Sequence, residues 1–327
     1  PRHLDLAKHL IGGDNRNPFN LVLFKKLVAL TPDDPFIRFK LMSIAREFCD
    51  HDCIDAQDAW LEGQLAAGRR DIFSAETPYS HLLHCADERL NRLATNNRDI
   101  PHAPSPGLAA KRRARPHVWT DKIRIGYLSG DFASTHATMR LLRDILERHD
   151  PETVEVSLYC YTPQSLIDAD DGGRALWGRI VPVRTLSDAD AAARIRADGI
   201  DILIDLKGHT GGSRAQILNH GAAPIQVAWL GFPGSTVNVD LDYIIADRIV
   251  VPQGSEPHYH EAVVRLRDSY QPNDPRHRPR PPAATRQSLG LPDDRFVFAS
   301  FNAARKITPQ TLALWAEILR SKPDSLL

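Results

Sequence analysis

The spacing of apolar residues predicts helices in the first third of the chain. From residue 1 to about residue 97, apolar side chains recur every three or four positions, as at Leu21, Phe24 and Leu27. This period places them on one face of an amphipathic helix, and Pro18 and Pro35 stand where such helices would begin. Short helices joined by turns are typical of helical-repeat arrays, but no clean repeat period is present, so a plain helical bundle stays equally open.

A proline-rich segment at residues 98–120 separates this helical region from the rest of the chain. Such a composition favours a linker. The segment contains a basic run, KRRAR, at residues 111–115. Aromatic residues would be expected to interleave a nucleic-acid groove, and none does so here. We therefore interpret the run as a solvated face of the linker.

Strand and helix patterns alternate over residues 121–271. Strand-like runs occur at residues 122–128, 154–161, 201–206, 225–230 and 243–246, and helical patterns cover residues 138–149 and 187–197. Ser187 is suited to cap the second of these helices and Gly199 to end it. Strands that alternate with helices predict an α/β fold with a parallel, doubly wound sheet.

A second α/β unit is predicted to begin near the end of the chain. A proline-rich linker at residues 272–285 precedes a strand at residues 295–301 and a helix that opens at Thr308 and Pro309. Residues 286–327 are too few to bury a core of their own. The chain starts with Pro1 and stops at apolar residues typical of the start of another strand. We therefore expect both ends to lie inside a longer polypeptide.

Composition narrows the class of protein. The 327 residues fit about two domains, and 42% hydrophobic with 25% charged residues is ordinary for a soluble protein. Lys plus Arg equals Asp plus Glu at 41 each, which argues against a nucleic-acid partner. No apolar run approaches the roughly 20 residues of a membrane span, and no signal peptide is visible. The four cysteines lack metal-ligand spacing and fit a reducing cytoplasm.

Candidate chemistry is expected where parallel strands end, because ligands bind beyond the carboxyl ends of such strands. His136 follows the first strand and would lie at a helix N-terminus. The helix dipole there disfavours imidazolium and leaves a neutral ring able to accept a proton. A loop histidine that only caps the helix or faces water is the competing interpretation.

Three further segments follow strands in the same way. Gly208 and His209 follow the third strand, and the loop Gly231, Pro233 and Gly234 follows the fourth. Glycines allow a backbone to approach a ligand closely, although they also suit any tight turn.

After the strand of the second unit come Asn302 and Lys306, the latter just before a helix N-terminus. That place suits phosphate oxygens, and a solvated surface lysine is the alternative.

Absent fingerprints exclude several enzyme classes. No G-x-G-x-x-G follows a strand, and no P-loop or G-x-S-x-G elbow occurs. Asp-x-Asp pairs, which can hold Mn²⁺ or Mg²⁺ on a nucleotide sugar, occur at residues 168/170, 188/190 and 240/242. With 41 acidic residues such pairs are expected by chance, and we predict no metal ligands.

The motifs, taken in order, resemble one family. They are residues 124–132 (RIGYLSGDF), 136–138 (HAT), 195–210 (IRADGIDILIDLKGHT), 223–234 (APIQVAWLGFPG), 242–247 (DYIIAD), 270–274 (YQPND), and 301–302 with 306–307. This series resembles the catalytic region of glycosyltransferase family 41, the O-linked N-acetylglucosamine transferases and their bacterial relatives. The helical region is similar to the tetratricopeptide-repeat end of that family.

The resemblance implies a two-lobed glycosyltransferase of the GT-B type. A tetratricopeptide-like helical region (residues 1–97) and a linker (98–120) would precede a Rossmann-like lobe (121–271). A second linker (272–285) would lead to the start of the donor-binding lobe (286–327). Such enzymes transfer N-acetylglucosamine, or a related hexose, from UDP to Ser or Thr hydroxyls, with inversion and without a metal or other cofactor.

The resemblance also implies roles for the candidate residues. His136 matches the active-site histidine, although the group that takes the proton in this family is unsettled. Gly231 and Pro233 match a loop that lines the sugar pocket. Lys306 matches the lysine that neutralises the diphosphate leaving group, a sensible role where no metal is used. Gly208, His209, Gly234 and Asn302 complete the expected donor and substrate site, with His209 where relatives often carry an aromatic residue.

The expected partners are a UDP-sugar donor and a protein or peptide acceptor gripped by the helical region, with no nucleic acid and no membrane. Because most of the donor lobe would be missing, we expect the 327-residue chain alone to be inactive. One alternative is a non-catalytic peptide-binding helical module with a vestigial α/β lobe. Another is a metal-dependent transferase that uses an Asp-x-Asp pair.

Overall fold

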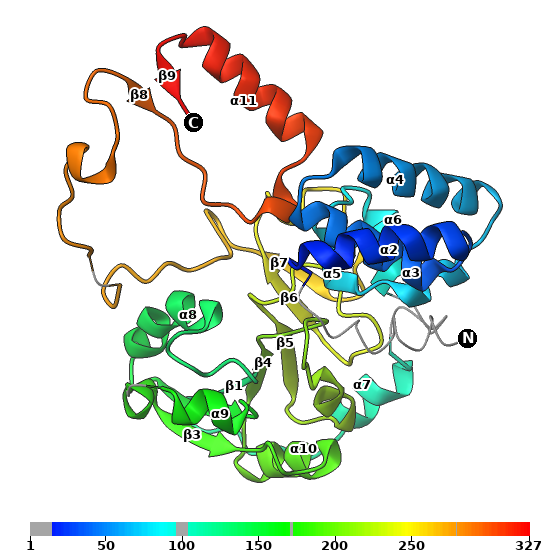
Figure 1. Ribbon diagram of the computed structural model, residues 1–327. Coiled ribbons are helices and arrows are strands. Elements are labelled where there is room, and N and C mark those ends of the chain that lie inside the picture. Colours follow the sequence, from blue (N-terminus) through cyan, green and yellow to red (C-terminus); the bar gives the residue numbers. More distant parts are fainter. Residues whose placement is uncertain (1–14, 96–103, 171–172, 279) are drawn as a thin grey trace. The chain divides into compact units, whose positions relative to one another are not determined.

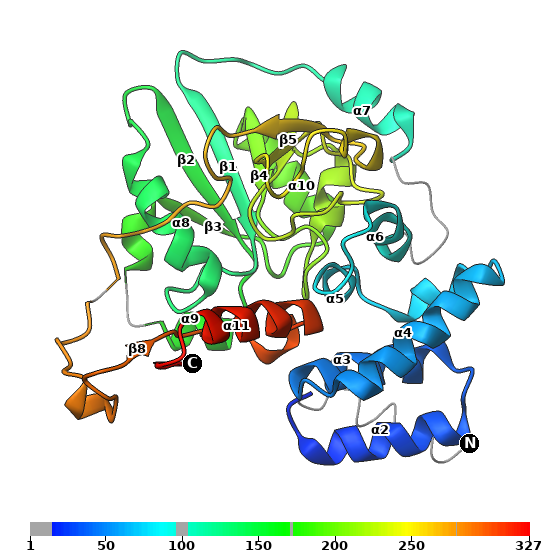
Figure 2. The same ribbon diagram turned by 90° about the horizontal axis from the view of Figure 1, so that it is seen from above.

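The computed structural model describes residues 15–95, 104–170, 173–278 and 280–327 (Figures 1 and 2). These residues form two compact units. The helical unit consists of the described residues up to His84 together with Arg280–Leu327. The sheet unit consists of the described residues from Cys85 to Arg278. The helix predicted for residues 1–14 and 96–97, and the linker predicted for residues 98–103, lie outside the described residues.

A seven-stranded sheet forms the centre of the sheet unit. All its neighbouring pairs are parallel, in the order β3-β2-β1-β4-β5-β6-β7. The strands are β1 (Ile123–Ser129), β2 (Val154–Cys160), β3 (Arg179–Pro182), β4 (Ile202–Asp205), β5 (Ile225–Ala228), β6 (Tyr243–Ala246) and β7 (Ala262–Arg265). This arrangement confirms the predicted doubly wound α/β fold. The order reverses between β1 and β4, so the sheet has its switch point there.

Helices cover both faces of this sheet (Figures 1 and 2). They are α6 (Glu88–Thr95), α7 (Pro106–Arg113), α8 (Ala137–Arg148), α9 (Gln164–Asp168) and α10 (Asp188–Ala197), with 3₁₀ turns η2 (Arg174–Trp177), η3 (Ala215–His220) and η4 (Glu256–His258). Successive strand residues point to opposite faces. Tyr127 of β1 therefore joins a core with α8, whereas Leu128 joins a core with α10 and η3.

The helical unit contains the predicted helices. They are α2 (Pro18–Leu30), α3 (Pro35–Glu47), α4 (His51–Ala66), η1 (Asp71–Ala75) and α5 (Pro78–Leu82). The side chains of Asn17, Asp34 and Asp50 cap α2, α3 and α4 by accepting backbone N–H groups. Apolar faces of these helices meet in a core around Phe24, with Leu27, Ile37, Leu41 and Ile44.

The last part of the helical unit contains η5 (Gln287–Leu289), β8 (Phe296–Val297), η6 (Ala304–Lys306), α11 (Pro309–Ser321) and β9 (Ser325–Leu326). Thr308 caps α11 as predicted. The strand predicted at residues 295–301 is shorter, because β8 pairs only with the two residues of β9. A strand without a partner leaves backbone groups unbonded, so pairing ends where β9 ends.

The basic run at residues 111–115 is a solvated face only in part, because Arg112 is buried while the other four residues are exposed. It ends helix α7, and the Arg112 side chain is 1% exposed. Its guanidinium donates to Asp240 at 2.8 and 3.1 Å and to Asp242 at 2.9 Å. Spacing could not identify this arginine, because its partners lie more than 120 residues away in sequence.

Candidate active site at the carboxyl ends of β1 and β4

The loops after β1 and β4 meet at the switch point of the sheet. These two strands are neighbours, with Leu128 level with Asp205. Open parallel sheets bind ligands at this position, because the connections on either side leave in opposite directions and open a crevice. Five of the residues singled out from the sequence follow β4 and β5, and His136 follows β1.

His136 is the N-cap of α8. Its Nδ1 accepts the backbone N–H of Thr138 at 3.2 Å. A nitrogen that accepts a hydrogen bond carries no proton, so the neutral ring holds its proton on Nε2. That atom lies 3.6 Å from Oδ1 of Asp131, and the side chain is 41% exposed. The lone pair of the neutral ring is therefore engaged by the cap, and its N–H faces a carboxylate.

Asp131 joins the loop after β1 to the loop after β4. Its Oδ1 accepts from the ammonium of Lys207 at 2.6 Å, and the two side chains are 12% and 8% exposed. A largely buried ion pair of this kind needs both partners, because either charge alone would lie unpaired in a poorly solvated place. The pair fixes the carboxylate that Nε2 of His136 faces.

Asp205 closes the end of β4. Its carboxylate accepts the backbone N–H groups of Lys207 and Gly208 at 3.4 and 2.7 Å. Burial raises the pKa of Asp205 to about 6, against the lowering effect of those two N–H groups. Asp205 thus shapes the turn that carries Lys207 toward Asp131.

Gly208 and Gly231 allow the loops after β4 and β5 to lie against each other. Gly208 has a φ of +51°, and a Cβ on it would lie 2.6 Å from Cβ of Phe232. A Cβ on Gly231 would lie 2.1 Å from the carbonyl oxygen of Leu206. Both positions therefore require glycine for packing within the chain. The close approach is between two loops of the protein itself.

His209 packs beside Phe232. Its Nε2 lies 3.2 Å from the carbonyl oxygen of Val237, so Nε2 carries the proton and donates it. Its ring meets the Phe232 ring edge-on, with centroids 5.5 Å apart. Burial lowers the pKa of His209 to about 4, and the ring is neutral at neutral pH.

The remaining residues of the loop after β5 hold its backbone in place. The carbonyl of Pro233 accepts from the hydroxyl of Tyr259 at 3.2 Å. Gly234 is buried, and the next residue, Ser235, donates to Glu261 at 2.7 Å.

Asn302 and Lys306 belong to the helical unit, so their predicted place in a groove with His136 stays a prediction. Lys306 is exposed in η6, three residues before α11 begins. Asn302 is also exposed, and its amide nitrogen lies 3.4 Å from the Ser300 hydroxyl. The prediction that Lys306 lies just before a helix N-terminus is confirmed.

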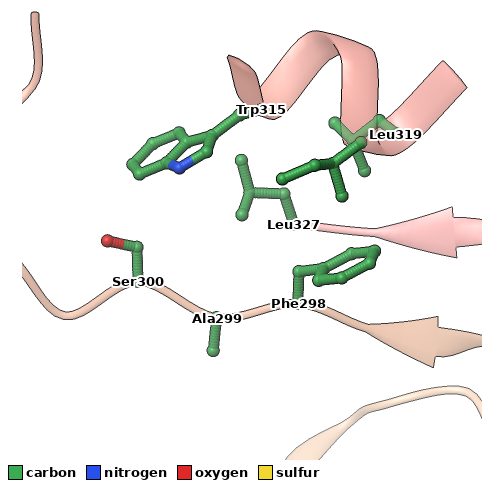
Figure 3. Close-up of a pocket in the computed structure, with 7 residues that line it drawn as sticks. Phe298, Ala299, Ser300, Trp315, Leu319 and Leu327 are labelled. Carbon is green, nitrogen blue, oxygen red and sulfur yellow. The ribbon is translucent and has the colours of Figure 1, made fainter. Parts of the chain in front are cut away.

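A pocket of about 130 Å³ near β8 and α11 offers no acid or base. Phe298, Trp315 and Leu319 surround Leu327 there, with Ser300 at the edge (Figure 3). Its lining is apolar apart from one hydroxyl, so it does not compete as a catalytic site.

Two of the three Asp-x-Asp pairs are engaged by guanidinium groups. Asp240 and Asp242 hold Arg112, and Asp188 accepts from Arg214 at 2.6 Å. These guanidinium groups stand where a divalent cation would have to bind. The observation disfavours a metal role for these pairs.

Sequence reasoning missed Asp131 and Lys207. Asp131 comes two residues after β1, and Lys207 two residues after β4. Asp131 and Lys207 therefore follow the ends of strands, as His136 and Gly208 do. The sequence does not show that β1 and β4 are neighbouring strands, and this arrangement is what brings the two side chains together.

The comparison with protein families gives a match over most of the sheet unit and the last part of the chain. Residues 109–280 and 274–327 match the model of glycosyl transferase family 41. These ranges include every candidate site residue.

The curated relatives are longer proteins. A probable UDP-N-acetylglucosamine–peptide N-acetylglucosaminyltransferase, SEC, from Arabidopsis thaliana is 31% identical over 78% of this chain and 26% of its own length. SPINDLY from rice, with the same enzyme description, is 31% identical over 65% of this chain and 23% of its own length. The chain thus spans about a quarter of these relatives.

A solved structure also matches. An O-GlcNAc transferase mutant from Thermobaculum terrenum is 29% identical, with a TM-score of 0.63, and the match covers 94% of this chain and 57% of that one.

Proposed function

This chain belongs to glycosyltransferase family 41, and we propose that the protein containing it transfers N-acetylglucosamine, or a related hexose, from UDP to Ser or Thr hydroxyls of proteins. The observation that carries the proposal is His136 at the switch point, capping α8 and facing Asp131. Relatives described as UDP-N-acetylglucosamine–peptide transferases support the donor and the acceptor class.

His136 and Asp131 act on the acceptor hydroxyl in this proposal. For His136 to take a proton, the lone pair on Nδ1 must be released from the Thr138 amide. If the cap stays, His136 instead donates from Nε2, and the carboxylate of Asp131 is the acceptor for the proton. Both routes need the imidazole of residue 136 and the charge of residue 131, and Lys207 keeps that charge in place.

The loops after β4 and β5 bind the substrate. Gly208, His209, Gly231, Pro233 and Gly234 form a rigid wall, and the neutral His209 offers the lone pair of Nδ1 to a sugar or peptide donor group. A rigid wall helps because catalysis depends on holding the reacting atoms within fractions of an ångström.

Lys306 and Asn302 bind the UDP in this proposal. The Lys306 ammonium stabilises the negative charge that develops on the diphosphate as the sugar leaves, so transfer needs no metal ion. We assign Asn302 and Lys306 to donor binding because the chain belongs to this family. That they approach His136 is part of the proposal.

The helical unit binds the acceptor polypeptide in this account, and the protein works in the cytoplasm. All four cysteines are free thiols in the structure, which suits a reducing compartment. No helix among the described residues is both long and apolar enough to span a bilayer.

Sugar transfer by the protein that contains this chain tests the proposal. Labelled UDP-N-acetylglucosamine should give protein-bound label that excess UDP abolishes, and added Mn²⁺ should not increase the rate. Changing Lys306 to Ala should lower transfer at least about 100-fold, on the scale of losing one charge-stabilising group. Changing Lys322, at the other end of α11, to Ala should leave the rate unchanged. Equal losses in both variants, or Mn²⁺-dependent transfer, would contradict the proposal. The inactivity of the 327-residue chain alone stays a prediction for the same assay.

A further inference from the structure

Glu76, His81 and His84 form a buried cluster in the helical unit, outside the residues assigned to transfer. Glu76 directly follows η1, His81 lies in the five-residue helix α5, and His84 follows that helix. The spacing Glu-x₄-His-x₂-His brings all three from one short segment. Their side chains are 3%, 1% and 12% exposed, respectively.

The three side chains converge on one point. Nδ1 of His81 lies 2.6 Å from Oε2 of Glu76, and Nε2 of His84 lies 2.9 Å from Oε1. One ligand atom from each residue falls within 4.8 Å of the other two. The His81 ring is held edge-on to Phe73, with centroids 5.4 Å apart. The cluster is therefore positioned by packing as well as by hydrogen bonds.

Within the part of the chain that the structure describes, the carboxylate of Glu76 makes no direct ion pair with a permanent cation, and the buried guanidinium of Arg46 acts on it from a greater distance. Among the described residues, no lysine or arginine comes within ion-pair distance of its carboxylate, and its ion-pair partners are the two imidazoles. Buried carboxylates are normally matched by a fixed cation or a metal. Here a positive charge in direct contact with the carboxylate would come from a proton on one imidazole or from a bound cation.

A second cluster of metal-capable side chains shows the opposite arrangement. Asp144 accepts from Arg148 at 2.6 Å and from Arg276 at 3.1 Å, while Asp274 and His277 lie beside it. Its carboxylate charge is matched by two guanidinium groups. That cluster has no need of a metal ion.

We propose that Glu76, His81 and His84 bind one Zn²⁺ ion in the helical unit. Two imidazole nitrogens and one carboxylate oxygen are a recognised zinc ligand set, and this set suits zinc better than magnesium or calcium. Tetrahedral ligands about 2.0 Å from zinc lie about 3.3 Å from one another. The present separations of 2.6 and 2.9 Å reach that value by small side-chain movements. On binding, zinc takes the lone pair of Nδ1 of His81 and of Nε2 of His84, and the proton of each neutral ring moves to its other ring nitrogen.

A water molecule can supply the fourth ligand. His84 lines a cavity of about 180 Å³, with polar neighbours that include His51 and Asp58. This cavity gives the ion a route to the otherwise buried Glu76. The bound ion would join the end of η1 to the C-terminal end of α5, in a stretch of short elements.

Metal binding by the untagged protein tests the proposal. Purified metal-free protein titrated with Co²⁺ should bind one equivalent and show the visible absorption of tetrahedral cobalt, and Zn²⁺ should displace it. One equivalent of Zn²⁺ should also raise the thermal midpoint by about 5 °C, because a ligand that binds the folded state stabilises it.

Variants identify the ligands. Changing His84, the most exposed of the three, to Ala should lower Zn²⁺ affinity at least about 100-fold, and Glu76→Gln should do the same while keeping the side-chain shape. His51→Ala is the matched control, because His51 lines the same cavity but lies outside the cluster; it should keep full stoichiometry. Absence of micromolar Zn²⁺ binding by the unaltered protein would overturn the proposal, as would equal binding by the folded His84→Ala variant. The transfer assay does not depend on these results.

Discussion

Changing Gly231 to Ala should destabilise the sheet unit and disturb the proposed active site. The new Cβ would lie 2.1 Å from the carbonyl oxygen of Leu206 and 3.3 Å from Cα of Lys207. Both atoms are backbone, so no side-chain rotation can relieve the contact. The loops after β4 and β5 must part by about 1 Å to restore van der Waals separation.

The size of the effect follows from that displacement. Overpacking in a well-packed region destabilises by about 1–3 kcal/mol, and a backbone contact belongs at the upper end. With an m value of about 3 kcal/mol/M, a loss of about 3 kcal/mol lowers the urea midpoint by about 1 M. Movement of Leu206 also shifts Lys207, whose ammonium lies 2.6 Å from Asp131, so transfer activity should fall as well.

Urea unfolding of Gly231→Ala and Gly211→Ala provides the assay. Gly211 lies in the neighbouring loop, and a Cβ there would meet nothing within 4 Å. The control should stay within about 0.5 kcal/mol of the unaltered protein, as surface changes do. Equal urea midpoints for the two variants would refute the packing of the two loops described above.

Three further predictions concern charge. Arg112→Ala should destabilise by about 3–5 kcal/mol in urea, because it leaves Asp240 buried without its cation; a loss below about 1 kcal/mol would contradict this. Lys207→Met should destabilise by about 3 kcal/mol, and adding Asp131→Asn should recover part of the loss; simple additivity in the double variant would argue against the pair. His209, whose pKa is lowered from 6.5 to about 4, favours the fold in its neutral form, so its contribution is complete above pH 6.5 and disappears as the pH falls toward 4. Between pH 7 and pH 4 the protein should therefore lose about 3 kcal/mol more stability than His209→Gln does, and parallel pH profiles would contradict the assignment.

The order of strands and helices could be predicted from the sequence where apolar residues recur at the regular spacing of a strand or a helix. Residues 243–246 were predicted as a strand and form β6. Ser187 caps α10, and Gly199 has the expected positive φ of +70°. In these places local chemistry alone decides the structure. Strands β3 and β7 were missed, because they lie at the edges of the sheet and stay partly exposed, without the buried apolar run that marks β4 and β5.

The candidate site could be predicted only in part. His136 and the glycine loops were found because they follow predicted strands. The partners of His136 could not be identified, because they depend on which strands are neighbours. The ion pair of Asp131 with Lys207 joins residues 76 positions apart. The spacing of apolar residues within one helix or strand cannot predict such a contact. The same reason explains Arg112, whose burial depends on carboxylates from a distant loop.

The rate of sugar transfer by the His136→Asn variant tests the central claim most directly. Asn can still cap α8, so the fold should survive, but its amide cannot accept a proton from the reacting hydroxyl. Thr135→Ala, an exposed change in the same loop, is the control. We predict that His136→Asn lowers transfer from UDP-N-acetylglucosamine at least about 100-fold with an unchanged circular dichroism spectrum, whereas Thr135→Ala keeps the full rate. Transfer by His136→Asn at the rate of the unaltered protein would contradict the assignment of the β1 and β4 edge as the active site.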